Sequence, residues 1–259
     1  MISDILVQTM RPLSFRGKLR LLNTFIPHEG ERTVMAHGCL FRLDLGEYIQ
    51  RSVYLGTFES EEASLVAGFL KPGHTFVDAG ANIGYFTGLA ASCVGPAGRV
   101  LAVEPSTMAF LRLERMVQEN HLRQVTLHHG ALGDRSHDAP LYLDESRRNN
   151  RNHSPSLVAQ GDRFALETVP VTTLDLLAEK HGLGRIDLLK VDVEGHEPAL
   201  LAGARRLIGE QRIGAIFCEV DEFNLRAAGT SGEHLLAQFK ALGFRPVRQI
   251  SNNYFFTQS

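Results

Sequence analysis

The stretch His74–Gly84 reads HTFVDAGANIG and decides the fold of this chain. Its apolar first half, His74–Asp78, predicts a buried strand, and the periodic stretch Ile83–Cys93 predicts the helix that follows. The same alternation of strand and helix runs to the end of the chain. Further strands are expected at 99–104, 125–129, 186–191, 213–220, 244–247 and 254–257, and further helices at 107–120, 173–180, 198–208 and 233–242.

These strands lack polar alternation, which is typical of strands buried on both faces of a parallel sheet. The pattern therefore predicts an α/β fold, with a Rossmann-like, mostly parallel seven-stranded sheet and helices on both faces. The turn formers Ser251–Asn253 predict a terminal hairpin, which would make one strand at the chain end antiparallel.

Two regions lie outside this pattern. The first 60 residues are expected to form an N-terminal helix and a small β-rich prelude, with strands at 37–45 and 52–58, while 61–259 form the main domain. Between residues 133 and 171, short strands are expected at 139–143 and 168–171. The polar segment Glu145–Ser156 between them predicts an exposed loop near the mouth of the site.

The composition is that of an ordinary soluble globular protein, with 259 residues, 44% hydrophobic, 22% charged and a net charge of −2. This balance lacks the basic excess typical of nucleic-acid binding, so we expect no nucleic-acid partner. No apolar run reaches the roughly 18 residues of a transmembrane helix. Charges break any signal-peptide core, so a cytoplasmic location is expected. Three cysteines, Cys39, Cys93 and Cys218, form neither a disulfide framework nor a metal motif.

The turn after the first strand has the residues of a small-ligand site. Gly80 permits a sharp turn where a side chain would collide with a ligand, and Gly84 permits close packing of the helix on the strand. Asn82 tolerates left-handed backbone angles. Backbone N–H groups at the start of the helix are expected to face the ligand.

Two carboxylates narrow the ligand class. Asp78 at the strand end would repel a pyrophosphate and attract a ligand with an ammonium and a sulfonium group. Glu104 ends the next strand, about 20 residues after Gly84, where a carboxylate accepts hydrogen bonds from ribose hydroxyls. Together they favour S-adenosylmethionine over NAD as cofactor. A nucleotide-dependent oxidoreductase on the same fold and a non-catalytic nucleoside-binding module remain as alternatives.

The segment Asp192–Glu197, DVEGHE, follows a strand directly and is expected to carry the chemistry. Methyl transfer to a hydroxyl, the reaction that the family resemblance given below implies, needs a base. His196 titrates near neutrality, Asp192 lies nearest the strand end and can also touch the cofactor, and Glu194 is a third candidate. Asp192 and Glu219 end neighbouring strands, so a Mg²⁺ ion held by them is a weaker alternative.

Five segments in this order resemble the FkbM-type methyltransferases over roughly residues 40–220: VDAGANIGYFTGLAA, GRVLAVEPS, GALGD, VPVTTLDLL and IDLLKVDVEGHEPALLAGARRLI. The resemblance implies a class I methyltransferase fold, S-adenosylmethionine as methyl donor, and O-methylation of a small hydroxylated acceptor (a sugar, glycolipid or polyketide-type metabolite). It implies cofactor roles for Asp78, Gly80, Asn82, Gly84 and Glu104. The chain departs from the family at 57–59, where Thr-Phe-Glu replaces a frequent Tyr-Glu. Neither the acceptor nor the oligomeric state follows from these patterns.

Overall fold

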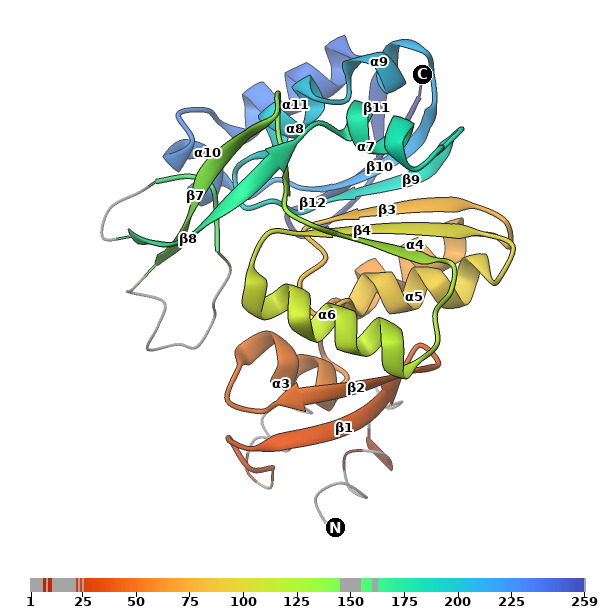
Figure 1. The fold of residues 1–259 in the computed structure, drawn as a ribbon, viewed down its shortest axis with the longest axis vertical. Coiled ribbons are helices and arrows are strands. Elements are labelled where there is room, and N and C mark those ends of the chain that lie inside the picture. The colour runs from red at the N-terminus through yellow and green to blue at the C-terminus, as the bar shows by residue number, and fades with distance from the viewer. Residues whose placement is uncertain are drawn as a thin grey trace.

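The computed structural model describes residues 7, 9–10, 22, 24, 26–144, 155–159 and 163–258. The expected N-terminal helix and most of the Asn- and Arg-rich segment 145–156 lie outside these residues. Within the described part, a seven-stranded sheet has the order β11-β12-β10-β9-β3-β4-β5 (Figure 1). Its strands are β3 (Thr75–Ala79), β4 (Arg99–Glu104), β5 (Val125–His129), β9 (Ile186–Val191), β10 (Ile213–Glu219), β11 (Phe244–Ile250) and β12 (Asn253–Gln258).

The prediction of a mostly parallel sheet is confirmed. The neighbours from β10 to β5 pair in parallel, whereas β12 runs antiparallel to both β10 and β11. The expected terminal hairpin therefore exists, and its last strand inserts between β11 and the parallel core. This places the carboxyl ends of β3, β4, β9 and β10 along one edge, where ligands gather in open α/β sheets.

Helices cover both faces of the sheet (Figure 1). One layer holds α4 (Ser60–Phe69), α5 (Tyr85–Val94) and α6 (Thr107–Glu119), and the other holds α7 (Leu174–Lys180), α8 (Glu197–Ala202), α9 (Arg205–Gly209) and α11 (Gly232–Ala241). A short helix, α10 (Glu222–Ala227), follows β10. Adjacent residues of β3 enter different cores: Phe76 packs in the first layer and Val77 in the second, and neither is exposed. Burial on both faces explains the continuous apolar character of this strand.

The prelude is only partly as predicted. Strands β1 (Glu31–Ala36) and β2 (Cys39–Asp44) form the expected hairpin, but the expected strand at 52–58 is wrong. That region forms helix α3 (Tyr48–Leu55), which ends at Gly56 with φ +65° and the Gly56 N–H bonded to the last-turn carbonyls. A glycine in this left-handed position is a helix stop signal. The β-branched and aromatic residues before it suggested a strand instead.

The prelude is tied to the main sheet. The Asn120 side chain accepts from the Leu40 N–H at 2.7 Å and donates to the Leu40 carbonyl at 2.8 Å. Phe41 and Leu43 pack in the same hydrophobic core as Phe76. The expected domain boundary near residue 60 stays a prediction.

Between β5 and α7 the chain forms a second sheet of order β6-β8-β7. The strands are β6 (Ala131–Leu132), β7 (His137–Asp144) and β8 (Arg163–Thr172), and the last two form an arm that extends beyond the main sheet (Figure 1). Both are longer than the short strands expected at 139–143 and 168–171. The expected helix 198–208 is divided into α8 and α9 at Gly203, where a Cβ would lie 1.9 Å from the Gly133 carbonyl oxygen.

The three cysteines are free, and Cys39 and Cys218 are buried, as expected of small apolar side chains. Among the described helices, none combines the length and apolar character that crossing a membrane requires.

Candidate functional site

A cavity of about 430 Å³ opens at the carboxyl ends of the central strands. It lies among the turn after β3, the ends of β4, β9 and β10, the first turns of α3 and α6, and the β7–β8 arm. The lining includes most of the residues singled out from the sequence: Gly80, Asn82, Glu104, Asp192, Glu194, His196 and Glu219. The glycine turn and the DVEGHE segment, more than 100 residues apart in the sequence, therefore meet at one site.

Four backbone N–H groups of the glycine turn are bonded within the protein. The N–H groups of Gly80 and Ala81 both donate to the Val103 carbonyl at 3.0 Å, and the Asn82 N–H donates to the Glu104 carboxylate at 2.8 Å. The Gly84 N–H donates to the Ala81 carbonyl at 2.8 Å. These donors bind the protein itself and do not face a ligand. The N–H groups of Gly80, Ala81, Asn82 and Gly84 are therefore not available to hold a pyrophosphate.

The two glycines are needed for close contacts within the protein. At Gly80, φ is +81°, and a Cβ would lie 1.8 Å from the Asp192 carbonyl oxygen. Among the protein's own atoms, the close approach that requires glycine is thus to the β9–α8 loop. A collision with the ligand at the same position stays a prediction. At Gly84, φ is +89°, and a Cβ would lie 2.4 Å from the Met116 methyl group and 2.7 Å from a Leu113 methyl group. The glycine at position 84 therefore allows close packing against α6, whereas close packing of the helix on the strand was expected. Asn82 has the expected left-handed backbone, with φ +50°.

Glu104 is buried at the end of β4, yet its carboxylate reaches the cavity. One oxygen accepts from the Asn82 N–H at 2.8 Å and the other from the Ser106 N–H at 2.9 Å. Burial raises the pKa of Glu104 to about 7, against the lowering effect of these two hydrogen bonds. The carboxylate is fixed in position and retains free lone pairs, so it can accept hydrogen bonds from a ligand diol.

Asp78 is fully buried and is not among the described residues that line the cavity. Its Oδ2 accepts from the Thr87 hydroxyl at 2.6 Å, and Oδ1 lies 4.0 Å from the Lys190 Nζ. Burial raises the pKa of Asp78, and Lys190 and Thr87 oppose that rise. Direct contact between Asp78 and a ligand stays a prediction. In the structure Asp78 acts on the site through Lys190.

Lys190 is a site residue that the sequence analysis missed. It occupies β9 directly beside Asp78 of β3, and its side chain is 5% exposed. The Nζ donates to Asp192 Oδ2 at 2.8 Å and lies 5.0 Å from the centre of the Phe86 ring. Burial lowers the pKa of Lys190, but the carboxylates of Asp192 and Asp78 outweigh it and raise the pKa above its ordinary value. Lys190 is therefore a permanent cation in the floor of the cavity.

Glu59 is a second missed residue. It lies just before α4 in a left-handed conformation, with φ +38°, and it lines the cavity. Burial raises the pKa of Glu59, and the nearby Lys190 opposes the rise. Strained backbone of this kind is concentrated at functional sites. The departure from the family pattern at 57–59 was the only signal for it in the sequence.

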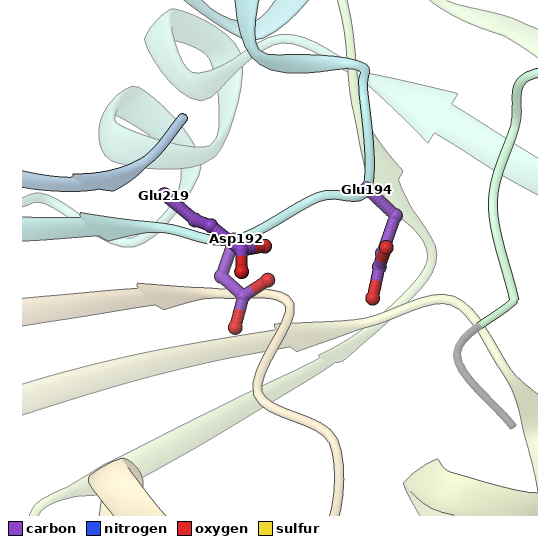
Figure 2. A group of neighbouring side chains, drawn as sticks. All are labelled: Asp192, Glu194 and Glu219. Carbon is purple, nitrogen blue, oxygen red and sulfur yellow. The ribbon is translucent and has the colours of Figure 1, made fainter. Parts of the chain in front are cut away.

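Three carboxylates meet at the edge of the cavity. Asp192 directly follows β9, Glu219 is the last residue of the adjacent strand β10, and Glu194 lies in the loop after Asp192 (Figure 2). Each offers an oxygen within 4.8 Å of the other two. Burial, together with repulsion from Asp192 and Glu194, raises the pKa of Glu219. The expected convergence of Asp192 and Glu219 is therefore present, with Glu194 as the third member.

His196 lines the cavity, but its Nε2 is buried and has no hydrogen-bond partner among the described residues. That nitrogen lies on the side of Gly133, 3.2 Å from where a Cβ of that glycine would be. Burial lowers the pKa of His196, so the ring is neutral near pH 7. It makes no side-chain cap on α8. Because Nε2 is inaccessible, only Nδ1 is left to accept a proton from a bound acceptor.

The order of the sheet, its antiparallel last strand and a cavity at the strand ends define a class I methyltransferase fold. The model of the FkbM methyltransferase domain matches residues 78–246, and the chain belongs to this family. Methyltransferase 1 of Beauveria bassiana (strain ARSEF 2860) is 30% identical in a match of 176 aligned positions that covers 61% of this chain and 66% of that protein. The matched part thus spans slightly less than two thirds of the relative.

Two solved structures also resemble the chain. The FkbM methyltransferase from Methylobacillus flagellatus KT has a TM-score of 0.47 and 15% identity, over 98% of this chain and 58% of that chain. Aeropyrum pernix fibrillarin, solved with natively bound S-adenosyl-L-methionine, has a TM-score of 0.44 and 14% identity, over 90% and 84% of the two chains.

Proposed function

We propose that this protein is an S-adenosylmethionine-dependent O-methyltransferase that acts on a hydroxyl group of a small molecule, of the sugar, glycolipid or polyketide type. The observation that carries the proposal is the single cavity in which the Glu104 carboxylate and the Lys190–Asp192 pair face the same space. The Glu104 carboxylate suits an adenosyl cofactor, and the Lys190–Asp192 pair suits removal of a proton from an acceptor. Membership of the FkbM methyltransferase family supports the same reaction class.

The residues present fit S-adenosylmethionine better than a dinucleotide. The Glu104 carboxylate is held ready for a ribose diol, as the sequence analysis expected. Carboxylates of Glu59 and Asp192 line the cavity and favour a cationic ligand. The N–H groups of Gly80, Ala81, Asn82 and Gly84 are bonded within the protein and are not available to a pyrophosphate. These features weigh against a nucleotide-dependent oxidoreductase.

When bound, the cofactor supplies a methyl group on a sulfonium, so that an oxygen–carbon bond forms as the carbon–sulfur bond breaks. The acceptor hydroxyl must lose its proton, and we assign Asp192 as the base. Its side chain is 30% exposed in the cavity, and Lys190 fixes Oδ2. Glu219 shares a side-chain hydrogen bond with Asp192, and this bond must give way when Asp192 accepts the proton. Glu194 accepts from the Asn224 side chain, and His196 has its Nε2 buried, so both are less suited.

Single variants test this assignment. Asp192→Asn is expected to lower turnover by about 10²- to 10⁴-fold, the usual contribution of a positioned base. His196→Ala and Glu194→Gln serve as matched comparisons within the same segment and should lower turnover less. Calorimetric titration with S-adenosylmethionine shows whether each variant still binds the cofactor. Full turnover in Asp192→Asn would remove it from the mechanism, and a larger loss in His196→Ala would transfer the role to that residue.

A protein that kept the pocket without catalysis gives a different result. It would bind S-adenosylmethionine and form no methylated product with any hydroxylated acceptor, as mass spectrometry would show.

A divalent cation is an alternative way to relieve the repulsion among Asp192, Glu194 and Glu219, because Mg²⁺ binds carboxylate oxygens. The raised pKa of Glu219, caused by burial and the neighbouring carboxylates, offers a proton for the same purpose. No step of the proposed reaction passes through a metal. We expect turnover to survive treatment with a strong chelator. A loss that added Mg²⁺ restores would assign the three carboxylates as metal ligands.

A further inference from the structure

Three exposed apolar side chains line the cavity, in contrast to its carboxylate-rich floor, and the partly exposed Glu47 and Arg112 line it near them. Tyr48, Met108 and Leu166 line the cavity and are 55%, 61% and 40% exposed. They belong to three separate elements: Tyr48 begins α3, Met108 lies in the first turn of α6, and Leu166 lies in β8. We call these three residues the apolar rim. The three residues lie far apart in the sequence, and the fold brings them to the same cavity.

The β7–β8 arm continues the apolar rim into the cavity. Successive residues of a strand point to opposite faces, so Leu141 and Leu143 share one face of β7. Both line the cavity together with Leu166 of β8. In the register of the arm, Leu143 pairs with Phe164, two residues before Leu166. Phe164 is 39% exposed and does not itself line the cavity. The arm therefore places Leu141, Leu143 and Leu166 along the cavity, although the β7–β8 pairing is irregular between Leu141 and Tyr142.

Exposed apolar side chains that gather at the mouth of a binding cavity are a mark of ligand contact. A free sugar has hydroxyls over most of its surface and gains little from such a rim. An alkyl, polyketide or aryl group would remove the rim from water and gain about 25 cal/mol per Å² of apolar surface covered. The floor and the mouth of the cavity thus suit two different parts of one acceptor.

We infer that the apolar rim and the β7–β8 arm form an acceptor subsite, and that the acceptor is an amphipathic molecule whose reacting hydroxyl is joined to an apolar body. This inference rests on the proposed O-methyltransferase function and narrows its acceptor class. A hydroxyl near Asp192 at the floor would place the apolar body between α3, α6 and the arm. Free sugars are then poor acceptors.

Alkyl glucosides of increasing chain length test the inference with the hydroxyl part held constant. Methyl, butyl and octyl glucoside are compared below their micelle-forming concentrations, with S-adenosylmethionine saturating. We expect kcat/KM to rise about two- to fourfold for each added methylene, because each buried methylene contributes about 0.8 kcal/mol. A value that stays flat or falls with chain length would overturn the inference.

Rim variants locate the effect. Met108→Ser is expected to lower the ratio of kcat/KM for octyl glucoside over methyl glucoside roughly tenfold, the result of losing apolar contact in a pocket. Leu111→Ser is the matched control, because Leu111 lies one turn further along α6, is 57% exposed and does not line the cavity. Leu166→Ser and Val247→Ser, the latter 51% exposed on β11, form a second pair. Equal effects within each pair would contradict a subsite.

Binding without turnover separates this inference from the proposed function. Saturation-transfer NMR with octyl and methyl glucoside, in the presence of S-adenosylhomocysteine, reports contact even if no methyl group is transferred. Octyl-selective contact that Met108→Ser removes supports the subsite although O-methylation fails. O-methylation of free sugars with no octyl preference would overturn the subsite and keep the function. A dimer that Met108→Ser dissociates would show instead that a second copy covers the rim.

Discussion

Replacing Gly80 by alanine would separate two explanations of the glycine turn. In the structure, an added Cβ would lie 1.8 Å from the carbonyl oxygen of Asp192, and atoms in such contacts essentially never approach within 3.0 Å. The turn and the β9–α8 loop would have to move apart by about 1.2 Å, the difference between these distances. The Asp192 N–H also donates to the Ala79 carbonyl at 3.0 Å, so this movement would weaken the hydrogen bond between the ends of β9 and β3.

Two costs add at this position. A non-glycine residue at positive φ costs roughly 1–2 kcal/mol, and relieving an overpacked contact costs about 1–3 kcal/mol. We expect Gly80→Ala to lower the free energy of unfolding by about 2–5 kcal/mol. Gly73→Ala is the matched control, since Gly73 has φ +85° and a Cβ there meets nothing within 4 Å. It should therefore show the first cost alone, about 1–2 kcal/mol.

Chemical denaturation of both variants without cofactor measures the difference, and methyl transfer measures its effect on the site. Displacement of the Asp192 loop by about 1 Å is expected to lower turnover by roughly 10²-fold in Gly80→Ala, and Gly73→Ala should retain it. If Gly80→Ala were as stable as Gly73→Ala and merely bound S-adenosylmethionine more weakly, the close approach would be to the ligand, and the reasoning from the Asp192 carbonyl would be refuted.

Three further outcomes follow from the buried charges. Glu104→Gln cannot accept both backbone N–H groups, so calorimetry should show cofactor affinity at least about tenfold weaker; unchanged affinity would contradict the role of Glu104. Lys190→Met leaves Asp78 buried without its cation and should lower the free energy of unfolding by about 3–5 kcal/mol, whereas an equally stable variant would show that the ion pair does not support the fold. Burial raises the pKa of Glu104 and Glu197 from 4.5 to about 7, so the folded state binds more protons than the unfolded state between these pH values. The denaturant concentration at the unfolding midpoint of the cofactor-free protein should therefore decrease as the pH is raised from 4.5 to 7. An increase would contradict this reasoning.

The parallel core of the fold could be predicted from the sequence because burial on both faces leaves a strong signal. Strands β4, β5 and β9 begin and end where the apolar runs do. Helix α3 was missed because its β-branched and aromatic residues resemble a strand, although Gly56 marked its end. The lengths of β7 and β8 were underestimated, since an arm that is partly exposed lacks a continuous apolar run.

Most residues of the site could be predicted from the sequence, but the contacts between them could not. Asp192, Glu194 and Glu219 meet because the carboxyl ends of parallel strands share one edge, which the order of motifs implies. Lys190 was missed because a single lysine in an apolar strand gives no sign of a functional role until the structure shows its carboxylate partners. The reason for Gly80 was also out of reach, since its neighbour Asp192 lies more than 100 residues away in the sequence.

The most direct test of the central claim follows the methyl group itself. The protein is incubated with S-adenosylmethionine carrying a ¹³C-labelled methyl group and with octyl glucoside, and the product is examined by NMR beside the Asp192→Asn variant. We predict a labelled methyl group bonded to an acceptor oxygen, which disappears in Asp192→Asn although that variant still binds the cofactor. Failure of the wild-type protein to bind S-adenosylmethionine, or a labelled methyl group on nitrogen, sulfur or carbon, would contradict the account.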